Sequence, residues 1–384
     1  MQMALKAIGN PCASIPAIQI IGTNGKGSIA SFLQSSLNVL GIKGGITTSP
    51  HLISWCERIC INSKQIKIED LQKRLNDLNP LVENFNITTF ELLITTALDY
   101  FNDNDVELLI LEVGLGGRLD ATTAHPYRPI VAIGGIGLDH CEYLGSNLKD
   151  IALEKTAVIN PNCTVISARQ ETEVEDVIYS IAQKQNATLH WVEPLSPEWK
   201  LGLMGDFQRY NAAVAKGALE ALTGLGWHID QVKIKEGLAL AKWPGRLQTI
   251  YWKNMPILID CAHNPHAAKK LSEERKKWPK NDAGIQWIIG IQKHKDAPGI
   301  LKSLVKSNDA VYIVPVPECL SWTPKELLAN CPLLSKKLNG ADNIEQALSD
   351  IYLKKNCSNP FPVITGSIYL IGDLLKKSIH IKKS

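Results

Sequence analysis

The apolar residues of this chain fall into short continuous runs that alternate with longer runs at helical spacing. The first short run, Ala17 to Ile21, predicts a buried strand. A helical face follows it, formed by Ile29, Phe32, Leu33, Leu37 and Leu40. Gly41 is suited to end this helix, since glycine readily takes the left-handed conformation of a C-terminal cap. The pattern therefore predicts a strand that leads directly into a helix.

The same alternation continues along the chain in two series. In the first series we expect strands at 42–47, 108–113, 130–136 and 163–167, and helices at 66–78, 148–159 and about 174–185. A further helix, capped by Thr88 or Thr89, runs to Phe101, and another opens at 205–211 and runs to Leu222. In the second we expect strands at 247–252, 257–260, 285–289, 310–314 and 362–365, and helices at 265–277, 297–306 and 344–354. Alternation of this kind predicts α/β domains with mainly parallel sheets and right-handed crossovers.

The segment Trp243-Pro244-Gly245-Arg246 separates the two series and is interpreted as a hinge. We therefore expect an N-terminal domain at 1–243 and a smaller, Rossmann-like α/β domain at 247–384. In parallel sheets ligands bind at the carboxyl ends of the strands, so the polar turns at those ends are the candidate functional residues.

Composition narrows the class of protein. The chain has 384 residues, of which 45% are hydrophobic and 21% charged, with a net charge of +3. So small a net charge disfavours nucleic acid as a partner. No apolar run reaches the length of a membrane helix, and residues 1–16 lack the apolar core of a signal peptide. The nine cysteines form no C-x-x-C pair. We expect a cytoplasmic enzyme with reduced thiols and no membrane partner.

The turn after the first strand carries the strongest chemical signal. Residues 22–28 read Gly-Thr-Asn-Gly-Lys-Gly-Ser between the predicted strand and helix. Such a turn aims backbone N–H groups and the positive helix end at one point, which suits a polyphosphate. Lys26 adds a positive charge, and the Ser28 hydroxyl can bind Mg²⁺. The alternative is a glycine turn with a surface lysine. The spacing also departs from G-x-x-x-x-G-K-[ST], since Gly27 separates Lys26 from Ser28.

Two later strand ends carry residues suited to metal binding. Glu112 ends an apolar strand, where a carboxylate is costly unless it is paired or bound to a cation. A carboxylate bonded to backbone amides is the alternative to a Mg²⁺ ligand. His140 follows the next strand, and either a structural hydrogen bond or a metal would explain it. Ser49 lies in a further strand-end turn.

Other candidates have plausible structural explanations. Lys155 follows Glu154 in a predicted helix, where a solvated face is the ordinary explanation. Arg246 in the hinge either caps a turn or contacts a phosphate. Residues 260–266 read Asp-Cys-Ala-His-Asn-Pro-His. This segment suits a charged amino-acid ligand, but it also suits a helix N-cap followed by proline.

Taken together, the motifs resemble the Mur ligase superfamily, most closely the folylpolyglutamate synthase/dihydrofolate synthase family. They run in the family's order along nearly the whole chain: GTNGKGS (22–28), TSPHL (48–52), ERI (57–59), TFE (89–91), LEVGLGGRLDAT (111–122), IGLDH (136–140), EK (154–155), WPGR (243–246), DCAHNPHA (260–267) and GSIYLIG (366–372). The second and fifth motifs are specific to the folate branch, whereas the phosphate loop fits any Mur-type ligase.

The resemblance implies an ATP-dependent amide ligase with a P-loop-type ATP-binding N-terminal domain. ATP would phosphorylate a carboxylate, and the amine of L-glutamate would displace phosphate. The acceptor would be dihydropteroate, a folate or both, and the enzyme would act as a monomer. A monofunctional folylpolyglutamate synthase, another Mur-type amino-acid ligase, a nucleotide-gated binding protein and a DNA-binding ATPase remain the alternatives.

The resemblance also assigns roles to individual residues. The implied ATP-binding residues are Thr23, Asn24, Gly25, Lys26, Gly27, Ser28, Asn211, Arg246, Asp260 and Asn264. Two Mg²⁺ ions would be held by Ser28, Ser49, Glu112 and His140. Lys26, Glu112, His140, Lys155 and Arg246 would take part in catalysis, with Lys155 carbamylated. Thr89, His263 and Ser367 would contact glutamate or the acceptor.

Three features depart from the family pattern. Only 21 residues precede Gly22, where family members carry a longer arm. Phe207 replaces a common histidine, although Gln208 and Asn211 of the same pattern are retained. His294 stands where an acidic residue is common. The short arm leaves the choice between dihydropteroate and folates open.

Overall fold

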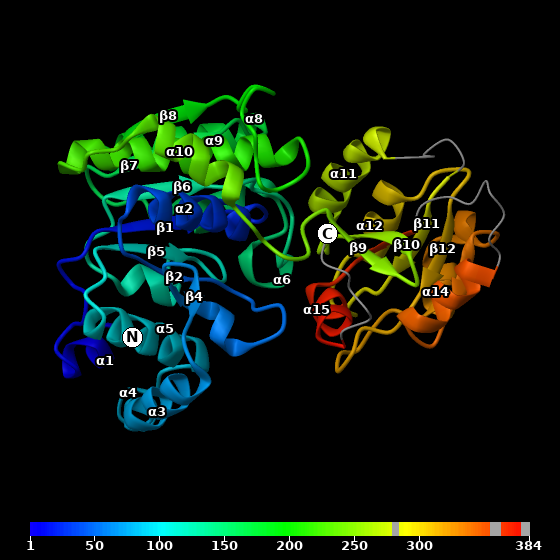
Figure 1. The fold of residues 1–384 in the computed structure, drawn as a ribbon, viewed down its shortest axis with the longest axis horizontal. Coiled ribbons are helices and arrows are strands. Elements are labelled where there is room, and N and C mark those ends of the chain that lie inside the picture. Colours follow the sequence, from blue (N-terminus) through cyan, green and yellow to red (C-terminus); the bar gives the residue numbers. More distant parts are fainter. Residues whose placement is uncertain (279–283, 354–361, 378–384) are drawn as a thin grey trace. The chain divides into compact units, whose positions relative to one another are not determined.

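The computed structural model describes residues 1–278, 284–353 and 362–377, and these form two compact units (Figure 1). Unit 1 comprises residues 1–203 and 207–243, and unit 2 comprises residues 204–206 and 244–384. The change of unit at Trp243 and Pro244 lies inside the segment that the sequence indicates as a hinge. Each unit is built around its own sheet.

Unit 1 has an eight-stranded sheet in the order β4-β3-β2-β5-β1-β6-β7-β8. Its strands are β1 Ala17–Ile21, β2 Gly44–Thr47, β3 Ile59–Ile61, β4 Lys64–Gln65, β5 Leu108–Glu112, β6 Ile130–Ile133, β7 Thr164–Ala168 and β8 Thr188–Val192. All neighbours from β2 to β8 pair in parallel, and β3 and β4 add an antiparallel edge. Every residue of β1, β2, β5 and β6 is buried, as expected for central parallel strands with both faces covered.

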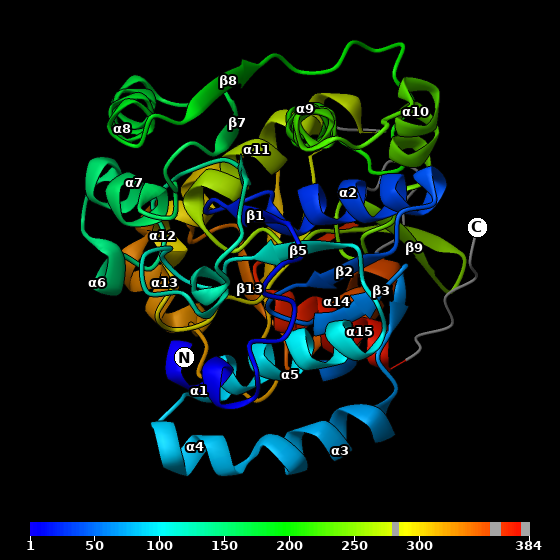
Figure 2. The ribbon, with the colours of Figure 1, turned by 90° about the vertical axis from the view of Figure 1, so that its left-hand side faces the viewer.

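Helices cover both faces of this sheet (Figure 2). Helices α2 Lys26–Leu40, α9 Phe207–Ala221 and α10 Gln231–Leu240 pack on the face that carries Ile18, Ile20 and Ile110. The other face, which carries Leu109, Leu111 and Val131, packs against α3 Ile68–Leu78, α5 Thr89–Asp103, α7 Leu148–Thr156 and α8 Thr172–Lys184. The shorter helices of the unit are α1 Gln2–Ala7, α4 Pro80–Phe85 and α6 Cys141–Leu144.

Unit 2 has a six-stranded sheet in the order β13-β12-β11-β14-β10-β9. Its strands are β9 Gln248–Trp252, β10 Met255–Ile259, β11 Gln286–Ile289, β12 Ala310–Ile313, β13 Leu338–Gly340 and β14 Pro362–Thr365. Among the described strands, β9 pairs antiparallel with β10 and all other neighbours pair in parallel. Its helices are α11 Pro265–Glu274, α12 Ala297–Leu304, α13 Pro324–Asn330, α14 Ile344–Leu353 and α15 Ile368–Lys376.

The predicted fold class, α/β with mainly parallel sheets, is confirmed. The strand predicted at 17–21 has those limits, and α5 begins at Thr89 after a capping box between Thr88 and Glu91. The strand predicted at 130–136 is shorter and ends at Ile133, where Gly134 and Gly135 follow. The helix predicted at 265–277 consists of α11, which ends at Glu274, and a 3₁₀ turn, Arg275–Lys277. The last residue of the helix predicted at 344–354 lies outside the described residues.

Within residues 1–278, 284–353 and 362–377, no helix combines the length and the apolar character needed to cross a bilayer.

A buried ion pair in unit 2 joins the 3₁₀ turn that follows α11 to the residue that precedes β12. The guanidinium of Arg275 donates two 2.7 Å hydrogen bonds to the carboxylate of Asp309, whose side chain is 0% exposed. Backbone N–H groups of Ile285 and Lys306 and the indole of Trp287 donate to the same carboxylate. Burial opposes ionisation of Asp309, but Arg275 and these donors outweigh it and lower the pKa of the carboxyl group.

We predict that Asp309→Ala lowers the free energy of unfolding of unit 2 by about 3–5 kcal/mol, because it leaves Arg275 charged and buried without its partner. Urea denaturation followed by tryptophan fluorescence measures this loss. Glu273→Ala is the matched control, because Glu273 pairs with Lys270 at the surface and such pairs contribute at most about 1 kcal/mol. Equal losses in the two variants would contradict the prediction.

Candidate nucleotide and metal site

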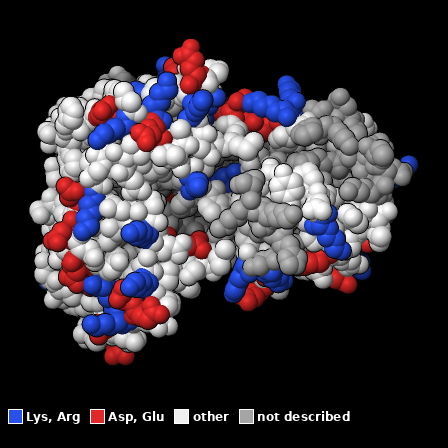
Figure 3. Space-filling view, viewed as in Figure 1, with Lys and Arg blue, Asp and Glu red and all other residues white. Residues whose placement is uncertain are grey.

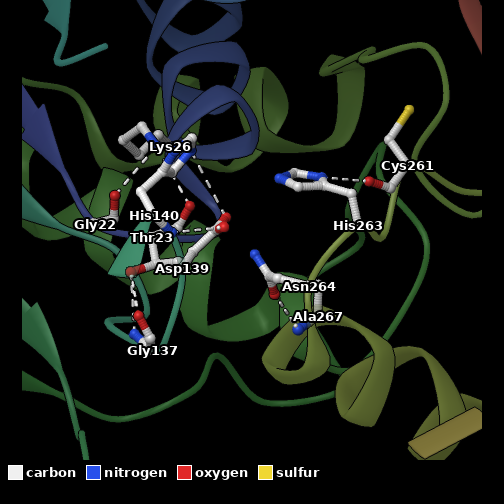
Figure 4. A network of polar contacts seen from close by, with 10 residues as sticks. All are labelled: Gly22, Thr23, Lys26, Gly137, Asp139, His140, Cys261, His263, Asn264 and Ala267. Carbon is white, nitrogen blue, oxygen red and sulfur yellow. Dashed lines mark hydrogen bonds and ion pairs between the residues drawn. The ribbon is translucent and has the colours of Figure 1, made fainter. Parts of the chain in front are cut away.

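The connection between β1 and α2 is a loop that is hydrogen-bonded to the backbone of the turn after the neighbouring strand, β6. The N–H groups of Thr23 and Asn24 both donate to the carbonyl of Gly135, each at 2.9 Å. The Thr23 hydroxyl donates to the carbonyl of Gly137 at 2.9 Å and accepts from its N–H at 3.0 Å (Figure 4). The hydroxyl of Thr23 is therefore engaged within the protein and fixes the loop to the turn that carries His140.

Two glycines of the loop are required by close packing. Gly25 is the N-cap of α2 with φ +87°, and a Cβ at this position would collide with the side-chain oxygen of Asn211. A Cβ on Gly27 would lie 2.9 Å from the indole nitrogen of Trp243. The loop and the first turn of α2 are therefore closely packed, with Asn211 directly against Gly25.

Lys26 is the first residue of α2, and its side chain folds back over the loop. Its ammonium donates to the carbonyls of Gly22 at 3.1 Å and Thr23 at 3.3 Å (Figure 4). These bonds keep a positive charge beside the N-terminus of α2. Anions are favoured there by both the lysine and the helix dipole.

Ser28 lies in the first turn of the same helix and is 2% exposed. Its hydroxyl oxygen accepts a 3.2 Å hydrogen bond from the side-chain amide of Gln208 on α9. The amide of Asn211 in turn donates to the carbonyl oxygen of Gln208 at 2.9 Å. The sequence analysis assigned Asn211 to the site but gave Gln208 no role. Their three-residue spacing, which places both side chains on the same face of one helix, was the signal that could have indicated Gln208.

The structure brings Ser49 and Glu112 together at the ends of two paired strands. β2 and β5 are parallel, with Thr47 opposite Leu111, so the residues after β2 lie beside the end of β5. The backbone N–H of Ser49 donates to the carboxylate of Glu112 at 3.2 Å. Glu112 is 4% exposed, and the Ser49 hydroxyl is buried with no hydrogen-bond partner. A buried hydroxyl without a partner costs free energy, so an oxygen-binding ligand at this position would relieve it.

These oxygen atoms fit a magnesium ion better than zinc. In the part of the chain that the structure describes, no three His, Cys, Asp or Glu side chains cluster as metal ligands. Mg²⁺ needs no such cluster, since it is usually bound by one or two carboxylates together with phosphate oxygens and water. One carboxylate, two serine hydroxyls and a phosphate loop are consistent with that chemistry.

His140 lies in the turn after β6 and caps the short helix α6 in a left-handed conformation, with φ 51°. Its backbone N–H donates to the carboxylate of Asp139 at 2.9 Å, and its ring nitrogen lies 4.0 Å from the same carboxylate. Figure 4 shows this turn beside Thr23 and Lys26. The turn therefore contributes a carboxylate and an imidazole next to the phosphate loop.

Lys155 is a buried amine near this cluster. It lies in the last turn of α7 and is 5% exposed. Burial and, after it, the charge of Lys26 lower its pKa to about 7, against the opposing effects of Asp139 and two further carboxylates. Among the described residues it makes no hydrogen bond or ion pair that would compensate its charge. The sequence-based alternative of a solvated charged face is therefore wrong for this lysine.

The candidates of unit 2 gather around the ends of β10 and β14. Asp260 follows β10, is 5% exposed and accepts N–H groups from Leu247 at 3.0 Å and Ala262 at 2.8 Å. Burial raises its pKa, although Arg246 and these donors oppose the shift. The His263 ring nitrogen lies 2.8 Å from the carbonyl of Cys261 (Figure 4).

Three further candidates have structural roles that the geometry shows. Asn264 is the N-cap of α11 and accepts from the N–H of Ala267, with proline at the next position. Ser367 is the N-cap of α15 and is 1% exposed. Thr89 is the first residue of α5 and is exposed. A role in ligand binding for these three stays a prediction.

The amino-acid sequence of this chain is similar to one family model and to proteins of other organisms. Residues 245–377 match the family model described as "Dihydrofolate synthetase, C-terminal domain". The chain is 30% identical over 410 residues to the "Probable dihydrofolate synthetase" of Schizosaccharomyces pombe, covering 98% of this chain and 96% of the relative. It is also 30% identical over 409 residues to the "Dihydrofolate synthase/folylpolyglutamate synthase" of Bacillus subtilis, covering 98% and 94%.

A solved structure is similar over almost the whole chain. The folylpolyglutamate synthase of Mycobacterium tuberculosis, complexed with ADP and AMPPCP, aligns with a TM-score of 0.88 and 26% identity. The alignment covers 97% of this chain and 93% of that chain. The similarity therefore extends through both units.

We predict that Lys155→Met stabilises unit 1. The unfolded lysine binds its proton below pH 10.5 but the folded one only below about 7, so folding near pH 7 costs on the order of 4 kcal/mol as an upper bound. The cost is fully present below pH 7 and fades as the pH rises toward 10.5. Urea denaturation in CO₂-free buffer at pH 7 and pH 9.5 measures the difference.

Lys149→Met is the control, because Lys149 is exposed on the same helix and should change stability little at either pH. A Lys155→Met variant that is less stable than wild type at pH 7, or a stability gap that does not shrink at pH 9.5, would contradict a buried, proton-deficient amine.

Proposed function

This chain belongs to the dihydrofolate synthase/folylpolyglutamate synthase family, and we propose that it joins L-glutamate to a pteroyl carboxylate at the expense of ATP. The observation that carries the proposal is the Ser49–Glu112 pair. A buried carboxylate and a buried hydroxyl without a partner lie at the strand end beside a phosphate loop. The relatives are ligases that form C–N bonds, and this geometry supplies what such a reaction needs.

The first half of the reaction must bring two anions together. The acceptor carboxylate oxygen attacks the γ-phosphorus of ATP, and the bond to the β,γ-bridging oxygen breaks, which gives an acyl phosphate and ADP. The N–H groups at the N-terminus of α2 and Lys26 hold the triphosphate and offset its charge. Bound Mg²⁺ supplies further charge neutralisation between the two anions. Ser28, Ser49 and Glu112 are the residues that would hold it, with His140 and Glu112 at a second ion.

In the second half, the amine nitrogen of L-glutamate attacks the acyl carbon. The carbon–oxygen bond to phosphate breaks, inorganic phosphate leaves, and the nitrogen loses a proton to solvent. The requirement on the protein is mainly positioning, because the acyl phosphate is already activated. For unit 2 we retain the roles that the family resemblance implies: Arg246, Asp260 and Asn264 toward the nucleotide, and His263 and Ser367 toward glutamate, with Thr89 of unit 1 also toward substrate.

We also propose that Lys155 is carbamylated. A pKa of about 7 leaves roughly half of the amine neutral at neutral pH, so its lone pair is available to attack CO₂. The new N–C bond forms as a proton is released, and the side chain changes from a cation to an anion. That change removes the repulsion between Lys155 and Lys26 and adds a carboxylate-like ligand near Asp139 and His140.

The acceptor is proposed to be either dihydropteroate or a reduced folate, with both activities in one enzyme. The relatives named for dihydrofolate synthesis and for both activities match the chain at the same identity and over the same 98% of it. A monofunctional enzyme is the alternative. All of the residues named above belong to one chain, so the proposal requires only a monomer.

The test is ATP-dependent incorporation of labelled L-glutamate, with dihydropteroate and tetrahydrofolate as separate acceptors. We expect ADP and amide product with both, and turnover reduced at least about 100-fold in Glu112→Gln, since this change removes a charged metal ligand. Circular dichroism confirms that the variant is folded. Product with neither acceptor would refute the proposal, product with only one would establish the monofunctional alternative, and wild-type turnover in Glu112→Gln would remove that residue from the mechanism.

A second prediction concerns the carbamate. Lys155→Ala should lose most of its activity, because it lacks the anion that the carbamate provides. Short carboxylic acids added to the buffer should restore part of the turnover by occupying the space that the side chain leaves. The measurement is the rate of ADP formation against the concentration of acetate or formate. Absence of rescue at any concentration, in a folded variant, would count against carbamylation.

A further inference from the structure

The buried side chain of Gln208 links two helices of the candidate site, α9 and α2. It is 0% exposed, and it lies on α9 while its partner Ser28 lies on α2. Its amide nitrogen donates to the hydroxyl oxygen of Ser28, and its carbonyl oxygen accepts from Asn211. Both hydrogen bonds are buried, so the loss of either would leave a polar group with neither a protein partner nor water to bond to.

Asn211 determines which way the Gln208 amide faces. The nitrogen of the Asn211 carboxamide is a donor only, so the atom of Gln208 that meets it must be the carbonyl oxygen. The nitrogen of Gln208 must then face Ser28, and the Ser28 oxygen must be the acceptor. A serine oxygen has two lone pairs, and this bond occupies one of them. The hydroxyl hydrogen and the second lone pair then share the two remaining directions, so the hydroxyl has two orientations open to it instead of three.

We propose that Gln208 is a positioning residue, which holds the Ser28 hydroxyl so that its second lone pair faces the magnesium ion. The inference rests on the magnesium site proposed above. Gln208 itself would not touch the ion or the nucleotide. Partners that orient a metal ligand commonly account for a 10- to 100-fold difference in metal affinity.

A purely structural role is the competing explanation, since α2 and α9 pack together in the same core. The two explanations differ in what they predict for metal affinity. A packing role would change stability alone, whereas a positioning role changes the affinity for the ion and acts only through the Ser28 oxygen. Metal binding in the presence and absence of that oxygen therefore separates them.

The experiment measures Mn²⁺ binding to the full chain in the presence of AMPPCP, from the electron paramagnetic resonance signal of free Mn²⁺. We expect the dissociation constant to rise about tenfold in Gln208→Met, which has a similar shape but no donor. Gln34→Met is the control. Gln34 lies on the same helix as Ser28, and its amide nitrogen is buried without a partner, so its loss should leave Mn²⁺ affinity within twofold of wild type.

A double-mutant cycle with Ser28→Ala completes the test. If Gln208 acts through Ser28, adding Gln208→Met to Ser28→Ala weakens Mn²⁺ binding no further. Weaker binding in Ser28→Ala with unchanged binding in Gln208→Met would overturn the inference and leave the proposed function intact, as would additive losses in the double variant. Unchanged binding in Ser28→Ala would remove Ser28 from the metal site and would overturn the inference, while leaving Ser49 and Glu112 as the proposed ligands.

Gln208→Asn replaces Gln208→Met if the latter does not fold. Asparagine keeps the carboxamide but is one methylene too short to reach Ser28, so the same weakening is expected. Wild-type Mn²⁺ affinity in a folded Gln208→Asn variant would overturn the inference.

Discussion

The parallel pairing of β2, β5, β1 and β6 is the constraint on which the candidate site of unit 1 depends. Register places Thr47 beside Leu111, Ile20 beside Glu112 and Ile21 beside Ile133. Four consecutive strands of the sheet therefore end at one edge. Because chain direction is shared, the turns that follow them emerge together. The phosphate loop, Ser49, Glu112 and the turn of His140 are brought together by this pairing, although almost 120 residues separate the first from the last.

The polar groups at that edge are unfavourable for the folded protein taken alone. Lys155 is buried with a pKa of about 7, and the Ser49 hydroxyl is buried without a partner. Each of these costs free energy unless something binds there. The surrounding core is apolar and closely packed, and it holds these groups in place. Residues that oppose folding but lie together at a strand end are the kind expected at a functional site.

Most of the fold could be predicted from the sequence, because the buried strands are continuous apolar runs and the main helices show a clear helical face. The prediction missed the helices α10 and α15, the edge strand β8 and several shorter elements: β3, β4, β13, α1, α4, α6 and α13. β8 is an edge strand whose residues are only partly buried, so it has no continuous apolar run. α10, Gln231–Leu240, mixes lysine and glutamate with its apolar residues and buries only Ile234, Gly237 and Leu238. β6 ends three residues earlier than predicted, where Gly134 and Gly135 begin the following turn.

The site was predictable in outline and less so in its details. The Gly-rich turn and the position of a carboxylate at a strand end identified the loop and Glu112, whereas Lys155 was assigned only by the family resemblance. Burial cannot be read from sequence, so a helical Glu-Lys pair is interpreted as a solvated face until the structure shows that Lys155 is buried. Thr23 was expected to bind ATP, and the structure shows its hydroxyl bonded to Gly137. Gln208 became part of the site only through its contact with Ser28, 180 residues away in the chain.

The most direct test is a crystal structure of the protein with AMPPCP and Mn²⁺, with the ion located by anomalous scattering. The account predicts the triphosphate against residues 22–28 and an ion within about 2.2 Å of Glu112 and of the Ser28 or Ser49 hydroxyl. A triphosphate bound elsewhere, with Glu112 remote from any ion, would contradict it.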